Sequence, residues 1–157
     1  MGGSGCDSSR GFRGRSDPGA GLLTESVLIR DPARIAPLLK VLSRMGISIA
    51  IDDFGTGYSS LSYLRQYRVH VLKIDRSFVA EIECSQQARV IPQAVVALGR
   101  ALKLRTVAEG VETDGQAEIL RGMGCDLLQG YGIGRPLDQA ATEALLLSRG
   151  RLDQATA

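Results

Sequence analysis

The chain alternates between short apolar runs and longer segments in which apolar residues recur every three or four positions. Four short runs, residues 47–51, 69–74, 104–108 and 126–129, predict buried β-strands, and Leu22–Leu23 predicts the remnant of a fifth. Strands that alternate with helical segments are typical of a parallel sheet with helices between its strands. The pattern therefore predicts an α/β fold.

The longer segments predict four helices, each with recognisable end signals. One begins at Pro32, after Asp31, and ends near Gly46, a residue suited to a helix C-terminus. The others cover residues 85–102, 113–123 and 137–147, with Thr113 and Asp138 as N-caps. Pro92 is expected to shift or kink the first turn of its helix.

The number of strand–helix units limits the architecture. A closed (β/α)₈ barrel needs eight strands and about 250 residues. This chain has 157 residues and four or five predicted units, so it supplies the elements of about half a barrel. An open half barrel leaves unpaired strand edges that call for a partner or a further segment. A small doubly wound sheet is the alternative that the same alternation permits.

The two ends of the chain differ in character from the part between them. Residues 1–21 are rich in Gly, Ser and Arg with few large apolar side chains, which predicts a disordered tail; a basic RNA-binding tail is the alternative. We therefore expect one folded domain over residues 22–150, followed by a second disordered tail over 151–157.

Overall composition excludes several classes of protein. Hydrophobic residues make up 44% of the chain, enough for a core, and a net charge of +2 favours neither a nucleic acid polymer nor an anionic membrane as partner. The three cysteines, Cys6, Cys84 and Cys125, are far apart, so reduced thiols are a simpler interpretation than a disulfide framework or a zinc site. No apolar run approaches the roughly 20 residues of a membrane helix, and no secretory signal is present. These features predict a soluble cytoplasmic chain.

Polar residues gather where the predicted strands end. Asp52 and Asp53 follow the first of the four runs, Lys73 lies near the end of the second, Glu109 and Glu112 follow the third, and Gln129 closes the fourth. The carboxyl ends of parallel strands share one edge of a sheet, where α/β proteins build active sites. Adjacent carboxylates favour a divalent cation, and Lys73 could orient a water or a phosphate oxygen. Together these groups suit metal-assisted phosphodiester hydrolysis.

Taken singly, the same residues have simpler interpretations. An Asp-Asp pair often caps a turn or helix, a lone lysine usually reaches to solvent, and Glu109 with Glu112 could be an acidic pair at a helix N-terminus. His70, the only histidine, lies inside a predicted strand and is expected to be structural.

Four long motifs resemble the EAL domain, the cyclic di-GMP-specific phosphodiesterase family. They are Asp52–Leu61 (DDFGTGYSSL), Leu72–Phe78 (LKIDRSF), Val107–Thr113 (VAEGVET) and Leu128–Tyr131 with Gly134–Pro136. The resemblance, from about Leu23 to Leu147, implies the C-terminal part of a modified TIM barrel. It also implies Mg²⁺- or Mn²⁺-dependent hydrolysis of cyclic di-GMP to linear pGpG.

The resemblance also implies roles for individual residues. Asp52 and Asp53 match metal ligands, Lys73 matches the lysine that holds the attacking water, and Glu109 matches a general base or metal-site partner. Glu112 and Gln129 match supporting residues, and Glu25 matches the glutamate that braces the loop after the aspartate pair. That loop, Phe54–Leu61, lies near the surface through which many members form homodimers.

Three metal ligands of the family pattern are missing from this chain. The Glu-Ala-Leu segment and the asparagine of the following strand are absent, and Leu22 stands where the family usually has a glutamate. Gly132 and Ile133 replace a larger apolar pair near the guanine pocket. Because two hard cations need more ligands than the remaining carboxylates supply, we expect this chain alone to be inactive. The alternative is a degenerate, non-catalytic module that binds a protein partner or cyclic di-GMP.

Overall fold

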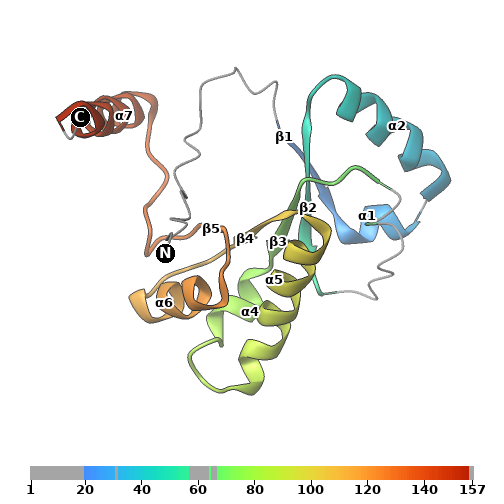
Figure 1. Ribbon diagram of the computed structural model, residues 1–157, viewed down its shortest axis with the longest axis horizontal. Helices are drawn as coiled ribbons and strands as arrows, with labels where there is room; N and C mark the ends of the chain where they lie inside the picture. The colour runs from blue at the N-terminus through green and yellow to red at the C-terminus, as the bar shows by residue number, and fades with distance from the viewer. Residues whose placement is uncertain (1–19, 31, 57–63, 65–66, 156–157) are drawn as a thin grey trace, which may run out of the picture.

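A computed structural model describes residues 20–30, 32–56, 64 and 67–155 of the chain. Its five strands form one parallel sheet in the order β1-β2-β3-β4-β5 (Figure 1). The strands are β1 (Ala20–Thr24), β2 (Ser48–Phe54), β3 (Val71–Ile74), β4 (Arg105–Ala108) and β5 (Leu127–Leu128). A doubly wound sheet would reverse its strand order partway. The unbroken order confirms the predicted partial barrel and excludes the doubly wound alternative.

Helices connect the strands. The structure contains α1 (Glu25–Arg30), α2 (Pro32–Arg44), α4 (Arg76–Ala80), the short 3₁₀ helix η1 (Gln87–Arg89), α5 (Val90–Leu102), α6 (Asp114–Met123) and α7 (Gln139–Ala155). No helix in the described part of the chain is long and apolar enough to cross a membrane.

Several predicted boundaries need correction. The second strand continues past Ile51, so Asp52 and Asp53 lie inside β2 rather than after it. The first strand is a full strand that begins at Ala20, because its backbone pairs with β2 from Ala20 opposite Ser48 onward. The last helix runs well beyond Leu147, to Ala155. The division into a tail, a domain and a second tail stays a prediction, since residues 1–19 lie outside the described part.

The helix-end signals act as the sequence predicts. Thr113 forms a capping box: its hydroxyl accepts the N–H of Gln116, and the Gln116 side chain accepts the N–H of Thr113. Asp138 caps α7 by accepting the N–H of Ala141 at 2.8 Å. Pro92 lies in the first turn of α5, where the missing N–H costs no helical hydrogen bond, so the regular helix begins at Val90 instead of Ser85.

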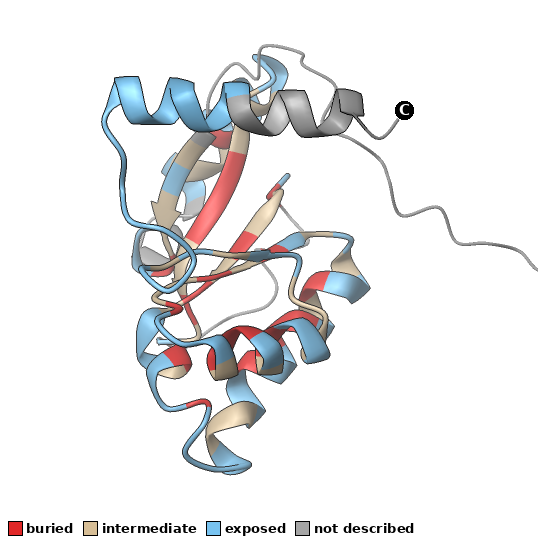
Figure 2. Ribbon diagram, turned by 90° about the vertical axis from the view of Figure 1, so that its left-hand side faces the viewer, coloured by how far each residue is buried: buried red, intermediate tan, exposed pale blue. Residues whose placement is uncertain are grey.

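The core lies between one face of the sheet and the helices packed on it. Fully buried side chains from β2 and β3 include Ile49, Ile51, Leu72 and Ile74. They pack in one cluster with buried residues of the helices, among them Val79, Val95, Val96, Ala117 and Leu120. Figure 2 colours the buried stretches of the strands and helices red. Among the described strands β1 pairs only with β2 and β5 only with β4, so each keeps one unpaired edge.

His70 lies just before β3 rather than inside a strand, and it hydrogen-bonds to Ile49. Its Nδ1 accepts the N–H of Ile49 at 3.1 Å, and its own N–H donates to the Ile49 carbonyl at 2.9 Å. This pair of hydrogen bonds ties the segment before β3 to the start of β2.

Candidate metal and catalytic centre

The aspartate pair lies at a β-bulge near the carboxyl end of β2. Ile51 pairs with Leu72 but Phe54 pairs with Ile74, so β2 has one residue more than β3 over this interval. Asp53 has φ 53°, a left-handed conformation that aspartate tolerates better than most residues with a side chain. Neighbouring side chains of a regular strand point to opposite faces, so the bulge accounts for both carboxylates serving one site.

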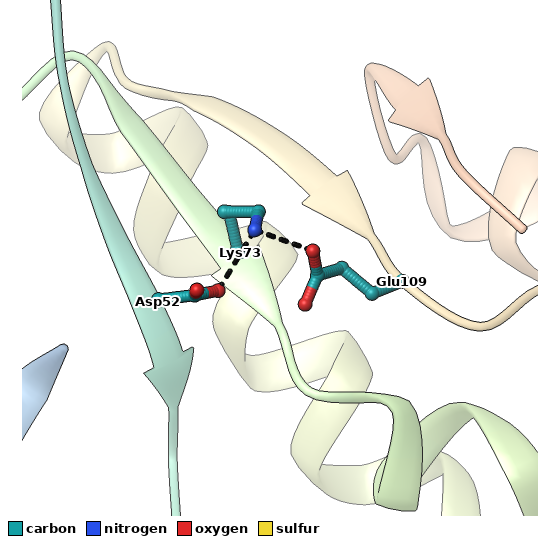
Figure 3. A network of polar contacts seen from close by, with 3 residues as sticks. All are labelled: Asp52, Lys73 and Glu109. Carbon is teal, nitrogen blue, oxygen red and sulfur yellow. Dashed lines mark hydrogen bonds and ion pairs between the residues drawn. The ribbon is translucent and has the colours of Figure 1, made fainter. Parts of the chain in front are cut away.

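Lys73 and Glu109 complete the cluster from the next two strands. Asp52, Asp53 and Glu109 each offer an oxygen within 4.8 Å of the others. The Lys73 ammonium lies between Asp52 and Glu109 (Figure 3): it donates to Asp52 Oδ1 at 2.9 Å and pairs with Glu109 Oε1. The side chains of Asp52 and Lys73 are each 15% exposed and that of Glu109 is 21% exposed. The centre is thus sheltered but open to small ions.

The charge state of Lys73 follows from its surroundings. Burial alone would lower the pKa of its ammonium, but hydrogen bonds to Glu109 and Asp52 and the charges of both carboxylates outweigh burial and raise the pKa. Lys73 therefore stays protonated at neutral pH. It can donate hydrogen bonds to an anion, and it cannot serve as a base.

Asp75 is a member of the site that the sequence reasoning missed. It follows β3 directly, accepts the N–H of Ser77 at 2.9 Å and its hydroxyl at 2.5 Å, and so caps α4. Those hydrogen bonds lower the pKa of Asp75. Burial, the charges of Asp52 and Asp75, and a hydrogen bond shared with Asp75 raise the pKa of Asp53. The signal was available, because Asp75 also lies at a strand end.

Glu25 supports the loop that follows the aspartate pair. Its side chain is 2% exposed, and Oε2 accepts the N–H of Gly55 at 3.2 Å. Gly55 has φ 97°, and Thr56 closes the turn by donating its hydroxyl to the Asp53 carbonyl at 2.8 Å. The resemblance assigned Glu25 to this loop, and its role in a working site stays a prediction. Most of the loop, from Gly57 on, lies outside the described residues, and with it the predicted dimer surface.

Glu112 and Gln129 are not part of the carboxylate cluster. The side chains of both are exposed. Their backbones join the segments that follow β4 and β5: the Gln129 N–H donates to Ala108 at 2.8 Å, and the Gln129 carbonyl accepts the N–H of Val111 at 3.0 Å. The Glu112 N–H donates to the Gln116 side chain at 2.7 Å, so the backbone of Glu112 belongs to the start of α6.

The donor set fits a hard divalent cation. Carboxylate oxygens are the ligands that Mg²⁺ and Mn²⁺ prefer, and Mg²⁺ usually keeps several waters beside one or two carboxylates. Asp52, Asp53 and Glu109 meet that requirement for one ion. Lys73 neutralises part of the same negative charge, so a bound cation would compete with it for Asp52 and Glu109.

Comparison with known proteins gives consistent matches. The sequence pattern of the EAL domain matches residues 22–136. Cyclic di-GMP phosphodiesterase NbdA of Pseudomonas aeruginosa is 48% identical over 124 residues, which are 79% of this chain and 16% of that protein.

Two solved structures agree with that match. The PaMucR phosphodiesterase in complex with c-di-GMP superposes with a TM-score of 0.75 at 47% identity, over 78% of this chain and 50% of that one. A manganese and cyclic di-GMP complex of Klebsiella pneumoniae BlrP1 gives a TM-score of 0.69 at 36% identity, over 74% of this chain and 30% of that one. The chain thus spans half or less of each of these proteins.

Proposed function

Because the chain belongs to the EAL domain family, we propose that it provides the C-terminal catalytic half of a cyclic di-GMP phosphodiesterase domain. The observation that carries this proposal is the convergence of three carboxylates and a protonated lysine at the ends of three adjacent parallel strands. The fold places these groups at the edge where α/β proteins build active sites. Hydrolysis of cyclic di-GMP to linear pGpG is the reaction that this set of groups suits.

Asp52, Asp53 and Glu109 would hold Mg²⁺ or Mn²⁺. When bound, such an ion polarises phosphoryl oxygens and lowers the pKa of bound water. The left-handed backbone of Asp53 keeps its carboxylate beside that of Asp52, and Glu25 fixes the following turn through Gly55. These contacts set the geometry of the site before any ligand arrives.

Lys73 would stabilise negative charge on the phosphate. Its raised pKa keeps it protonated, so it donates hydrogen bonds to a phosphate oxygen or to the attacking water. It already bridges two carboxylates from neighbouring strands, which holds the ammonium over the site without further ordering.

Glu109 is the group best placed to accept a proton. In this hydrolysis a water oxygen attacks phosphorus and the bond from phosphorus to the ribose 3′ oxygen breaks. One proton leaves the water, and one is taken up by the departing oxygen. Lys73 is protonated, which excludes it as the base, and the Glu109 carboxylate lies at the end of β4 and is the most exposed of the three groups in this network.

The number of carboxylate ligands predicts that the isolated chain binds metal but does not hydrolyse cyclic di-GMP. Two cations about 4 Å apart are the usual arrangement for phosphodiester hydrolysis, and each takes about six oxygens. Among the described residues one cluster of three carboxylates has metal-binding geometry. The second candidate function is a non-catalytic EAL module that binds the nucleotide, because three carboxylates are too few ligands for two cations.

Metal binding and turnover by the full chain test the proposal. We expect calorimetry to show Mn²⁺ binding that Asp52→Asn removes. Glu118→Gln, which removes an exposed carboxylate of α6 remote from the cluster, should leave it unchanged. We expect no conversion of cyclic di-GMP to pGpG by the chain alone. Mn²⁺-dependent conversion abolished by Asp52→Asn would overturn the expected inactivity and support the catalytic roles. No Mn²⁺ binding by a folded chain would overturn the proposed site itself.

A further inference from the structure

A pocket lies against α2, away from the carboxylates. This pocket of about 710 Å³ opens between one face of this helix and the segment that leads into β3. Its lining residues are Ala36, Pro37, Leu39, Lys40, Ser43 and Arg44 of α2, with Tyr67 and Arg68. Leu39 and Tyr67 are buried, at 3% and 6% exposure, and form an apolar floor. The volume falls within the range of small-molecule sites, roughly 300–1,000 Å³.

The described residues that line this pocket include cations and no anions. Lys40, Arg44 and Arg68 contribute three positive charges, and none of the described lining residues is a carboxylate. Within the described part of the chain, none of the three forms an ion pair with an acidic side chain. Arg44 lies in the last turn of α2, where it complements the helix dipole. Arg68 lies outside any described helix, so a helix dipole does not account for its charge at this pocket.

The pocket and the carboxylate cluster lie at opposite ends of the sheet. The C-terminal half of α2 leads into the amino end of β2, and Arg68 lies just before the amino end of β3. Asp52 and Lys73 lie toward the carboxyl ends of the same two strands. At a rise of about 3.3 Å per residue, the length of β2 separates the two sites by more than roughly 10 Å. A ligand in the pocket therefore does not occupy the metal centre.

We propose that this pocket binds a small phosphate-bearing ligand. Arginine guanidinium groups present paired N–H donors that match phosphate oxygens, and Lys40 and the Ser43 hydroxyl add single donors. The buried floor of Leu39 and Tyr67 would receive an apolar or planar part of the ligand, such as a nucleoside. The proposal does not depend on the proposed phosphodiesterase function, because it involves none of the same residues.

Titration of the full chain with inorganic pyrophosphate in EDTA tests this site separately from the metal centre. We expect saturable binding that weakens as salt is added. Arg68→Gln and Arg44→Gln should each weaken it by about tenfold, the effect of losing one charge-assisted contact. Arg105→Gln is the matched control, because Arg105 is exposed, lies at the same end of the sheet and does not line the pocket.

The outcomes separate a built site from general attraction between charges. Equal weakening by Arg105→Gln, or no binding by the folded wild-type chain, would overturn the proposal. Guanosine and guanosine monophosphate provide a second comparison with the same variants. If both bind equally and Arg68→Gln leaves both unchanged, the pocket recognises the nucleoside and the phosphate assignment fails. Tighter binding of the monophosphate, lost in Arg68→Gln, supports it.

Discussion

The left-handed backbone at Asp53 predicts an unusual order of stability for two substitutions. At an ordinary strand position, glycine is less stable than alanine by about 0.5–1 kcal/mol, because the unfolded chain gains freedom. At φ 53° alanine carries about 1–2 kcal/mol of strain that glycine does not. The difference between these terms makes Asp53→Gly more stable than Asp53→Ala by up to roughly 1.5 kcal/mol, with a central value of about 0.75 kcal/mol. Both variants lose the carboxylate, so the loss of its charge cancels in the comparison.

Urea denaturation in EDTA measures this difference. The control pair is Val107→Gly and Val107→Ala, because Val107 is half-buried in β4 and has no positive φ. At Val107 the alanine variant should be the more stable, and at Asp53 the glycine variant. If Asp53→Ala equals or exceeds Asp53→Gly, the backbone at Asp53 is not left-handed and the bulge explanation of the site is wrong.

Two further substitutions and one comparison of cysteine reactivity test other parts of the structure. Lys73→Met should lower the free energy of unfolding in EDTA by about 1–3 kcal/mol, since two charge-assisted hydrogen bonds in a sheltered but hydrated place are lost. Mn²⁺ should stabilise this variant more than the wild type in urea denaturation, because the ion replaces the missing positive charge; equal shifts would contradict the proposed competition. Asp75→Ala should cost about 1 kcal/mol near neutral pH through loss of the α4 cap. Ser77 lowers the folded-state pKa of Asp75, so the stability that the Asp75 cap contributes is present above pH 3.8 and disappears as the pH falls further. The denaturation curves of Asp75→Ala and the wild type should therefore converge in acid. Burial raises the pKa of the Cys125 thiol, whereas Cys84 is exposed. In a Cys6→Ser background, a disulfide reagent should therefore modify Cys84 about tenfold faster than Cys125, or more. Equal rates would contradict the burial of Cys125.

The strand ends were predictable because parallel strands share one direction. Once the apolar runs fixed the strands, Asp52, Lys73 and Glu109 had to lie at the same edge, and the structure brings them together. The bulge was not predictable, because it depends on how β2 pairs with β3 and not on the residues of β2 alone. The sequence alone therefore left open how adjacent aspartates could serve one site.

Helix caps were predictable from local chemistry, and the start of strand β1 was not. The hydroxyl of Thr113 satisfies a backbone N–H only three residues away, so the capping signal is contained in a short stretch of sequence. The first residues of β1, Ala20 and Gly21, have almost no side chain to show a pattern. Their strand conformation comes from backbone pairing with β2, a contact between distant parts of the chain.

The segments that follow β4 and β5 are packed closely against one another. A side-chain carbon at Gly130 would lie 2.2 Å from backbone atoms of Val111, and one at Gly132 would lie 2.5 Å from the Glu112 backbone. The Gly132 N–H also donates to the Val111 carbonyl at 2.9 Å. The two segments are therefore packed backbone against backbone at these glycines. Because the Gln129 N–H also donates to the Ala108 carbonyl, next to Glu109, a change that displaces the segment after β5 would also disturb the segment that carries Glu109.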